Sequence, residues 1–371
     1  MDMKFSIQRE VLLKRLQFLM GVVEKRHTMA ILANILVEVK GPLLKLTATD
    51  LELEVVATAN LESSVGDGRF TIPARKLFDI CRSLSENAVL SFTLDDKGRP
   101  IVISEKSRFS LSSLPAESFP AIESKLGSPS ISLAQKDLLS LLRKTYFSMA
   151  LQDVRYFLNG MLFEANGDQL KVVATDGHRL ALATHVISPS HNANAPIQVI
   201  IPRKAVIELM RLLQDTEEPV VLTFGTNHMR AELPDYQFTS KLIDGRYPDY
   251  NRVIPGDGAN VMLADAEQLR HALSRAAILA NEQYRGVRLK FGSNALQLSA
   301  NNPEQEEAED EVAVTYEGDK IEIGFNVGYL LEALSGLGQK VKMSLMDSNA
   351  SALIRDEADP SSLYVVMPIR L

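Results

Sequence analysis

Cysteine is nearly absent from this chain of 371 residues, which contains only Cys81. One thiol forms no internal disulfide framework and builds no metal site of several cysteines. The sequence also lacks a run of about 18 or more apolar residues, and its start, Met1–Phe5, lacks the apolar region of a signal peptide. We therefore expect a cytosolic protein without a bound metal or cofactor.

The short motifs of common enzymes are missing as well. The sequence has no phosphate-binding loop, dinucleotide fingerprint, nucleophile elbow or pair of metal-binding histidines at helical spacing. Asp176 and His178 form the most enzyme-like stretch, as parts of a hydrolase triad, but no motif supplies the nucleophile. Asp50 has the same place in the repeat described next, so a turn-forming role explains Asp176 more simply. We predict a non-catalytic protein and keep a hydrolase as the alternative.

Three kinds of segment recur in the same order along the chain. They are a strand that runs into a polar turn, a strand that enters a helix (through proline in two copies), and a late strand. Successive copies of a segment lie 126 to 129 residues apart. The landmark residues are Asp50, Asp176 and Asn302 in the turns, Pro73 and Pro202 before the helices, and Phe109, Phe238 and Tyr364 in the late strands. The third copy of the segment before a helix, Ile323–Asn326, has lost the proline. This spacing predicts three diverged copies of one module of roughly 125 residues.

The repeat also predicts where the modules end. It divides the chain into residues 1–127, 128–254 and 255–371. Residues 124–129 and 255–258 carry the proline, glycine and serine that are typical of loops, so we expect the linkers there.

Each predicted module opens with an amphipathic helix. In the first module the apolar stripe consists of Leu12, Leu16, Leu19, Met20 and Val23. The equivalent helices are expected at about residues 135–148 and 265–280, and short strands, a second helix and further strands follow in each module. Helices segregated on one side of antiparallel sheets make an α+β fold, and modules joined end to end can pair their edge strands across the boundaries.

Basic residues recur on the predicted helices. The pairs are Lys14 and Lys25, Arg75 and Arg82, Lys136 and Arg143, Lys204 and Arg211, and Arg270 and Arg275. A solvated helix face explains any single pair, whereas recurrence at equivalent repeat positions favours a shared function. Spaced Lys and Arg without interleaved aromatic residues suit phosphate contacts rather than base reading, which predicts sequence-independent DNA binding.

The net charge of −7 is unevenly distributed over the three modules. The first two hold 17 basic against 16 acidic and 13 against 13 residues, while the third holds 10 against 18. In the simplest interpretation, the acidic run at residues 304–311 is a solvated surface segment. Alternatively, it contacts the basic segment 106–111 of a second copy, and such a head-to-tail contact closes into a ring if the rotation permits.

Several long motifs point to a known family. They are the segments 152–156 (QDVRY), 159–164 (NGMLFE), 174–180 (ATDGHRL), 301–308 (NNPEQEEA) and 365–371 (VVMPIRL). With them the chain resembles, from Met3 onwards, the bacterial sliding clamps, the beta subunit of DNA polymerase III. The resemblance implies a non-catalytic processivity factor: a head-to-tail homodimer whose six modules close into a ring, with antiparallel sheets outside and helices lining a hole for duplex DNA.

The resemblance further implies partners and contact residues. The partners are double-stranded DNA, a clamp loader, the replicative polymerase and other proteins with a clamp-binding motif, with no membrane contact. The residues implied to contact DNA are Arg26, Arg75, Gln152, Tyr156 and Phe157, to which the helix pattern adds Lys204. The apolar dimer contact is implied for Phe109, Leu111, Ile278 and Leu279, and the charge pattern adds Lys106, Arg108, Glu304 and Glu306.

A cleft between the second and third modules is implied to bind partner peptides. Its residues are Leu158, Thr175, Gly177, His178, Arg179, Leu180, Pro248, Arg252, Val253, Ser351, Val365, Val366, Met367, Pro368, Ile369, Arg370 and Leu371. An apolar groove with a flexible methionine can accept several short peptides, although a buried core strand explains part of 365–367 equally well. The sequence departs from its relatives at Phe157, where tyrosine is frequent, at Ile369, where methionine is frequent, and at Met1-Asp2, which precede the usual start. A repeat scaffold without a DNA role remains a further alternative.

Overall fold

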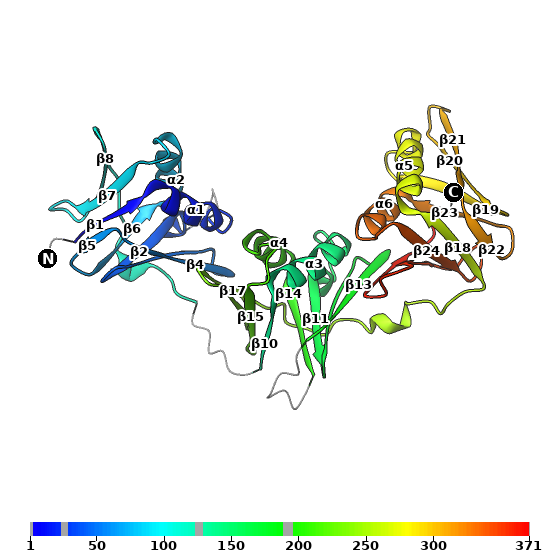
Figure 1. The fold of residues 1–371 in the computed structure, drawn as a ribbon, viewed down its shortest axis with the longest axis horizontal. Helices are drawn as coiled ribbons and strands as arrows, with labels where there is room; N and C mark the ends of the chain where they lie inside the picture. The colour runs from blue at the N-terminus through cyan, green and yellow to red at the C-terminus, as the bar shows by residue number, and fades with distance from the viewer. Residues whose placement is uncertain (1–2, 24–28, 123–128, 188–195, 371) are drawn as a thin grey trace. The chain divides into compact units, whose positions relative to one another are not determined.

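The structure, a computed structural model, describes residues 3–23, 29–122, 129–187 and 196–370. The chain divides into two compact units, one of Met1–Lys136 with Ile207–Leu242, the other of Asp137–Val206 with Ile243–Leu371. Figure 1 shows helices beside strands throughout. None of the helices over the described residues combines the length and the apolar character needed to cross a bilayer.

Three successive stretches of chain repeat one order of elements: a strand, a helix, a group of strands, a second helix and three strands. The first stretch contains β1 (Lys4–Gln8), α1 (Arg9–Leu19), η1 (Ala30–Ala33), β2 (Asn34–Lys40), β3 (Leu43–Thr49), β4 (Leu53–Asn60), β5 (Ser63–Val65), β6 (Gly68–Pro73), α2 (Ala74–Ser83), β7 (Val89–Leu94), β8 (Pro100–Ser104), β9 (Ser107–Ser110) and η2 (Ala116–Ser118). The second contains β10 (Ser130–Ala134), α3 (Gln135–Thr145), η3 (Tyr146–Ser148), η4 (Tyr156–Asn159), β11 (Gly160–Asn166), β12 (Gln169–Thr175), β13 (Arg179–Val186), β14 (Ile197–Pro202), α4 (Arg203–Leu212), β15 (Pro219–Phe224), β16 (His228–Glu232), β17 (Tyr236–Lys241) and η5 (Tyr250–Arg252). The third contains β18 (Asn260–Asp265), α5 (Ala266–Ala276), η6 (Ala277–Leu279), β19 (Gly286–Gly292), β20 (Ala295–Asn301), β21 (Glu307–Ala313), β22 (Thr315–Glu317), β23 (Ile321–Asn326), α6 (Val327–Ser335), β24 (Lys340–Leu345), β25 (Ala352–Asp356) and β26 (Ser362–Val366). The predicted α+β fold of three tandem modules is confirmed.

Four antiparallel sheets contain these strands. The first unit holds the sheets β5-β1-β7-β8-β9 and β10-β15-β16-β17-β4-β3-β2-β6, and the second unit holds β14-β11-β12-β13-β26-β25-β24-β18-β22 and β21-β20-β19-β23. Two of the sheets join modules: β17 pairs with β4, with Phe238 opposite Val55, and β13 pairs with β26, with Ala181 opposite Tyr364. The expectation that modules satisfy their edges by pairing across boundaries is therefore confirmed for both seams inside the chain.

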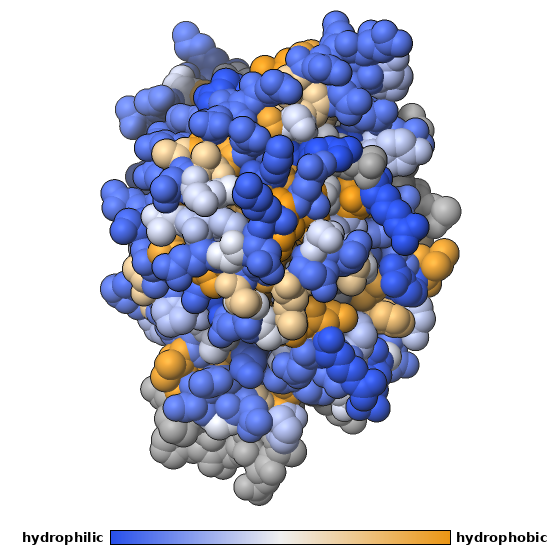
Figure 2. Space-filling view, turned by 90° about the vertical axis from the view of Figure 1, so that its right-hand side faces the viewer, coloured by the Kyte–Doolittle hydropathy of each residue, from blue (hydrophilic) through white to orange (hydrophobic). Residues whose placement is uncertain are grey.

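The helices bury their apolar stripes against these sheets. In the third module, α5 and α6 lie side by side (Figure 1) and share one core with Phe325 of β23. Leu269 and Leu273 of α5 and Leu330 of α6 are each about 1% exposed. Figure 2 shows a face of the molecule on which hydrophilic residues predominate and hydrophobic ones form small patches.

The first helix is shorter than the sequence predicts. It ends at Leu19, with Met20 as its C-cap, so Val23 lies beyond it. Lys25, predicted to share a face of this helix with Lys14, lies outside the described residues. Gly21 follows the C-cap, and its backbone N–H bonds the carbonyl of Phe18, three residues back, so the α-helical spacing ends there; glycine is also a poor helix former.

Proline forms the entry into the second helix in the first two modules. Pro73 is the N-cap of α2 and Pro202 is the last residue of β14, so each proline precedes its helix rather than occupying its first turn. In the third module Asn326 takes this place, and its side chain accepts hydrogen bonds from the backbone N–H groups of Gly328 and Tyr329. A capping side chain thus replaces the fixed φ of proline.

The predicted linkers fall partly outside the described residues. Residues 255–258 have no regular structure, as expected for a loop. Of the stretch 124–129, only Pro129 lies within the described residues.

Candidate functional site

A cavity of about 390 Å³ opens in the second unit, where the turn between β12 and β13 meets the end of β26. It is lined by Arg155, Phe157, Leu158, Thr175, Gly177, Arg179, Leu180, Pro248, Asp249, Tyr250, Val253, Val365 and Met367. The lining is mostly apolar, with arginine at two places on its wall. We call this cavity the cleft.

The turn that forms one wall of the cleft is held by its own side chains. Asp176 accepts hydrogen bonds from the backbone N–H groups of His178 and Arg179 at 2.9 and 3.0 Å. Gly177 has φ +88°, and a β-carbon on it would lie 2.9 Å from Nη2 of Arg155. Glycine at this position therefore allows both the left-handed backbone and the close approach of the Arg155 guanidinium. The turn-forming role predicted for Asp176 is confirmed.

Two tyrosines support the floor of the cleft. The Tyr247 hydroxyl accepts a hydrogen bond from the backbone N–H of Thr175 at 3.1 Å, and the Tyr250 hydroxyl donates one to Oε1 of Glu164 at 3.0 Å. Burial raises the pKa of both phenols above the ordinary value for tyrosine. Both hydroxyls therefore stay protonated at neutral pH.

Arg179 separates the cleft from a second depression. Its Nε bonds Oδ2 of Asp176 at 3.0 Å, its guanidinium contacts Glu332 of α6, and its side chain is only 10% exposed. The guanidinium also stacks over Tyr329, which lines the second depression. One buried cation thus joins the turn, helix α6 and both depressions.

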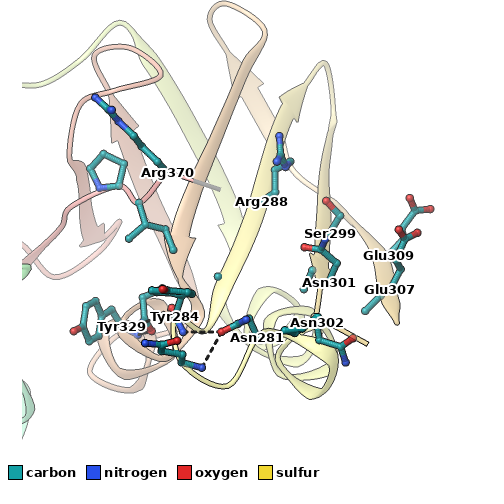
Figure 3. Close-up of a pocket in the computed structure, with 18 of the residues that line it drawn as sticks. Asn281, Tyr284, Arg288, Ser299, Asn301, Asn302, Glu307, Glu309, Tyr329 and Arg370 are labelled. Atoms are coloured by element: carbon teal, nitrogen blue, oxygen red, sulfur yellow. Dashed lines mark hydrogen bonds between the residues drawn. The ribbon is translucent and has the colours of Figure 1, made fainter. Parts of the chain in front are cut away.

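The second depression, which we call the groove, has a volume of about 780 Å³ and a more polar lining. Figure 3 shows Arg288, Ser299 and Asn301 on neighbouring strands of its wall. Asn281 Oδ1 accepts hydrogen bonds from the backbone of Gln283 and Tyr284 at the end near Tyr329. His178 and Met367 also line the groove, and Met367 lines the cleft as well, so the two depressions are neighbours.

The structure brings most of the predicted cleft residues together. Those in the cleft are Leu158, Thr175, Gly177, Arg179, Leu180, Pro248, Val253, Val365 and Met367, and those in the groove are His178, Met367, Pro368, Ile369 and Arg370. Three predicted residues line neither the cleft nor the groove. Arg252 forms an exposed ion pair with Asp249, Ser351 lies outside both linings, and Val366 is buried in the core, with 1% exposure. Leu371 lies outside the described residues.

Sequence reasoning missed several residues of the groove. Tyr284, Asn326 and Tyr329 line it, and none belongs to a motif that the sequence singles out for binding. In the sequence, Asn326 stands out only as part of the segment that has lost the repeated proline.

Comparisons with known proteins agree over the whole length of the chain. Three family descriptions match: DNA polymerase III beta subunit, N-terminal domain over residues 3–123, central domain over 132–249 and C-terminal domain over 251–370. The beta sliding clamps of Pseudomonas aeruginosa and Escherichia coli K12 are each 49% identical to this chain, with 100% of both chains covered. The chain belongs to the DNA polymerase III beta subunit family, the bacterial sliding clamps.

Solved clamp structures have the same fold. The Pseudomonas aeruginosa clamp bound to griselimycin matches with a TM-score of 0.96 at 49% identity, covering 100% of both chains. The Caulobacter crescentus clamp matches with a TM-score of 0.95 at 36% identity, covering 100% of this chain and 99% of that one. Sliding clamps bind DNA and polymerase, form dimers and are non-catalytic processivity factors, so the hydrolase alternative is wrong.

The residues predicted for the dimer contact of this clamp lie on or next to the edge strands of two sheets and in a helical turn beside one of these strands. Lys106, Arg108, Phe109 and Leu111 lie on or next to β9, the last strand of its sheet, and Glu304 and Glu306 precede β21, the last strand of another. Ile278 and Leu279 belong to η6, which contacts β21, and the Ile278 side chain is 76% exposed.

The residues predicted to contact DNA occupy two kinds of position. Arg75 is exposed on α2, and Lys204 is half-buried on α4. Gln152 has φ +56° in an exposed loop, next to Tyr156 with a 57% exposed side chain. Phe157 lines the cleft, with its ring 5.8 Å from that of Tyr156. Arg26 lies outside the described residues.

Metal chemistry finds no support in the described part of the clamp. Over those residues, no group of three or more His, Cys, Asp or Glu side chains is placed to hold a metal ion. Residues 307–311 of the acidic run lie in strand β21, where Asp310 pairs with Arg275 at 2.6 Å, and this hydrogen bond lowers the pKa of the Asp310 carboxyl.

Proposed function

We propose that two copies of this chain close head to tail into a ring of six modules around duplex DNA and tether the replicative polymerase to it. The proposal includes the module boundaries 1–127, 128–254 and 255–371, which the repeated element order supports. Because chromosomal DNA is its substrate, we also propose that the clamp works in the cytoplasm. The proposal rests on two edge strands that take no part in the two seams inside the chain.

The repeat predicts which edges meet between two copies. At each seam inside the chain, the strand after a module's polar turn (β4 or β13) pairs with the last strand of the next module (β17 or β26). In the third module the strand after the turn is β21, and in the first module the last strand is β9. Both strands end their sheets, so β21 of one copy is free to pair with β9 of another in the same way.

The repeat also predicts the register of this contact. Glu54 lies opposite Thr239 at the first seam and Leu180 lies opposite Val365 at the second. In the contact between two copies the equivalent residues are Glu307 and Ser110. Glu307 is the equivalent of Leu180 because it pairs with Asn301 as Leu180 pairs with Thr175. Glu307 then faces Ser110 of the second copy.

This register brings opposite charges together. It sets Arg108 opposite Glu309 and Lys106 opposite Glu311, all four exposed, and sets half-buried Phe109 opposite half-buried Ala308. The two strands thus match in charge on one face and in burial on the other. Leu111 faces Glu306, so Glu306 and Glu304 lie at the end of the contact, while Ile278 and Leu279 beside β21 extend its apolar part.

DNA contact is proposed for the basic helix residues Arg75 and Lys204 and for Arg26, Gln152, Tyr156 and Phe157. Lysine and arginine on helices contact phosphates without reading sequence, which leaves the ring free to slide. A closed ring does not leave DNA sideways, so weak contacts suffice. A polymerase held on the ring gains a high effective concentration at the primer end, which is processivity without catalysis.

The cleft and the groove are proposed to bind short segments of the polymerase, the clamp loader and other partners. The apolar lining of the cleft, the more polar lining of the groove and a methionine shared by both suit several related peptides. Griselimycin, which binds the Pseudomonas aeruginosa clamp, is proposed to bind here in the same cleft.

Retention on DNA tests the ring directly. After loading with a bacterial clamp loader, the clamp should stay on nicked circular DNA and slide off once the circle is cut. The mass in solution should be twice the chain mass of 41.0 kDa. Equal retention on circular and linear DNA, or a monomer at micromolar concentration, would falsify the proposal.

A further inference from the structure

The first module contains a second copy of the turn that forms the cleft. The Thr49 hydroxyl donates to the carbonyl of Leu53 at 2.8 Å and accepts from the N–H of Leu51 at 3.0 Å. Asp50 Oδ1 accepts from the N–H groups of Glu52 and Leu53 at 2.9 and 2.6 Å.

Every one of these bonds has its counterpart 126 residues later. The Thr175 hydroxyl donates to Arg179 at 2.6 Å and accepts from Gly177 at 3.1 Å, while Asp176 accepts from His178 and Arg179. The two turns are therefore the same structure on different sequences.

The surroundings of the two turns match as well. The N–H of Lys241 donates to the carbonyl of Glu52 at 2.8 Å, as the N–H of Met367 donates to that of His178 at 2.9 Å. The helical turn η1 occupies the place of η4, so Ile31 corresponds to Phe157 of the cleft. The segments that follow β9 and β17 also each carry an aromatic residue before proline, at 119–120 and at 247–248.

One position of the turn differs in a decisive way. Leu51 stands where the cleft has Gly177, with φ +76° against +88°. Left-handed backbone is unfavourable for leucine, and it persists only where the surroundings stabilise it. Here the Leu51 side chain packs against the cluster of Ile31, Leu32 and Phe119. The leucine side chain therefore covers the equivalents of Phe157 and Tyr247, whereas in the cleft the guanidinium of Arg155 lies against Gly177.

The walls around Leu51 also differ in polarity from the cleft. Glu54 replaces Leu180, and its Oε2 accepts a hydrogen bond from the N–H of Ile122 at 3.2 Å. Lys241 replaces Met367 at the rim. An apolar side chain entering here would meet one carboxylate and one ammonium group, so a ligand would be held less tightly than in the cleft.

We propose that the seam between the first and second modules holds a closed copy of the partner cleft, which Leu51 occupies, so that each chain offers one partner site instead of two. The ligand class of the closed site is that of the cleft, a short peptide with an apolar side chain. The proposal rests on the proposed function of the cleft, since it takes that cleft as the open reference.

Titration calorimetry with griselimycin counts the sites. The unaltered clamp should bind one molecule per chain. Leu51→Gly should bind a second, at least about tenfold more weakly because of Glu54, and Leu51→Gly with Glu54→Leu should bind the second more tightly than Leu51→Gly alone. Gly177→Leu should bind none, and Leu51→Gly combined with Gly177→Leu should bind one.

Glu105→Gly is the matched control, because it relieves a left-handed residue of the same module away from the seam, at φ +50°, and should leave one site. Should Leu51→Gly unfold at the assay temperature, Leu51→Ala offers a shorter side chain and must also gain a site. A folded set of Leu51 variants that all keep a single site overturns the inference. No binding to the unaltered clamp instead overturns the proposed function of the cleft.

Discussion

The guanidinium of Arg179 lies over the ring of Tyr329, with Cζ 4.3 Å from the ring centroid. Nη2 of the same group donates to the carbonyl oxygen of Phe147 at 2.5 Å, while Nε bonds Asp176. This residue of β13 therefore ties the second module to helix α6 of the third and forms the wall between the cleft and the groove.

Replacing Arg179 by lysine tests this role. Lysine keeps the positive charge but loses the planar group that stacks and donates in several directions at once. We expect a loss of about 2 kcal/mol in the free energy of unfolding and about tenfold weaker griselimycin binding. Denaturant unfolding and calorimetry measure the two effects. Arg252→Lys, on an exposed ion pair, should change neither, and an equal effect of both variants would contradict the assignment.

Charge reversal tests the proposed register between two copies. Arg108→Glu places two acidic side chains opposite each other at the edge of β9 and β21, so the mass in solution should shift towards the single chain mass of 41.0 kDa. Adding Glu309→Arg in the same chain restores opposite charges and should restore the dimer. Arg69→Glu, on an exposed ion pair with Glu117, is the control. If the double variant stays as monomeric as the single one, this register is wrong.

The order and type of the elements could be predicted because they depend on local patterns that recur. Strand, turn and proline signals repeat at a fixed spacing, and their agreement identifies the module even where the third copy loses its proline. The end of α1 was predicted too late because the apolar spacing continues past Leu19, although Gly21, a poor helix former, directly follows the C-cap. Apolar periodicity alone therefore overestimates the length of this helix.

The candidate site was predictable to the extent that motifs carry it. The turn around Asp176 is a local structure, so its residues were found, whereas Tyr284 and Tyr329 come together only in the groove. The acidic run 304–311 shows a second limit. Glutamates are poor strand formers, yet β21 forms because β20 offers it a full ladder of partners.

Removing single phosphate contacts should change how DNA binding depends on salt. Arg75→Ala and Lys204→Ala each remove one cation, so the slope of log affinity against log salt concentration should fall by about 1 for each, equally for any DNA sequence. Fluorescence anisotropy on short duplexes measures this slope. Arg355→Ala, which removes a cation paired with Asp257, is the comparison and should leave the slope unchanged. A change that depends on DNA sequence would point to base contacts instead.

The contact between Lys144 and Asp359 should make stability depend on pH in the acidic range. Hydrogen bonds from Ser361, together with the Lys144 ammonium, lower the pKa of the Asp359 carboxyl to about 2, against about 3.9 for an unfolded aspartate. Its stabilising effect is therefore complete above about pH 4 and is lost as the pH falls through about 2. Asp359→Asn should cost at most about 1 kcal/mol at pH 7, because the side chain is half-exposed, and nothing near pH 2. Urea unfolding at several pH values measures the difference in unfolding free energy between the two proteins. This difference should shrink as the pH falls, and a constant difference would contradict the prediction.

Tyr247 and Tyr250 offer a matched pair for the floor of the cleft. Tyr247→Phe leaves the partly buried backbone N–H of Thr175 without its acceptor, which costs about 1–3 kcal/mol of unfolding free energy. Tyr250→Phe removes a donor to Glu164, whose partly exposed carboxylate can bond water instead, so its cost should stay below about 1 kcal/mol. Because Thr175 lies on the cleft wall, only Tyr247→Phe should also weaken griselimycin binding, by several-fold. Equal losses in both variants would mean that the Thr175 bond does not hold the wall in place, and the shape of the cleft would then depend on Gly177 and Arg179 alone.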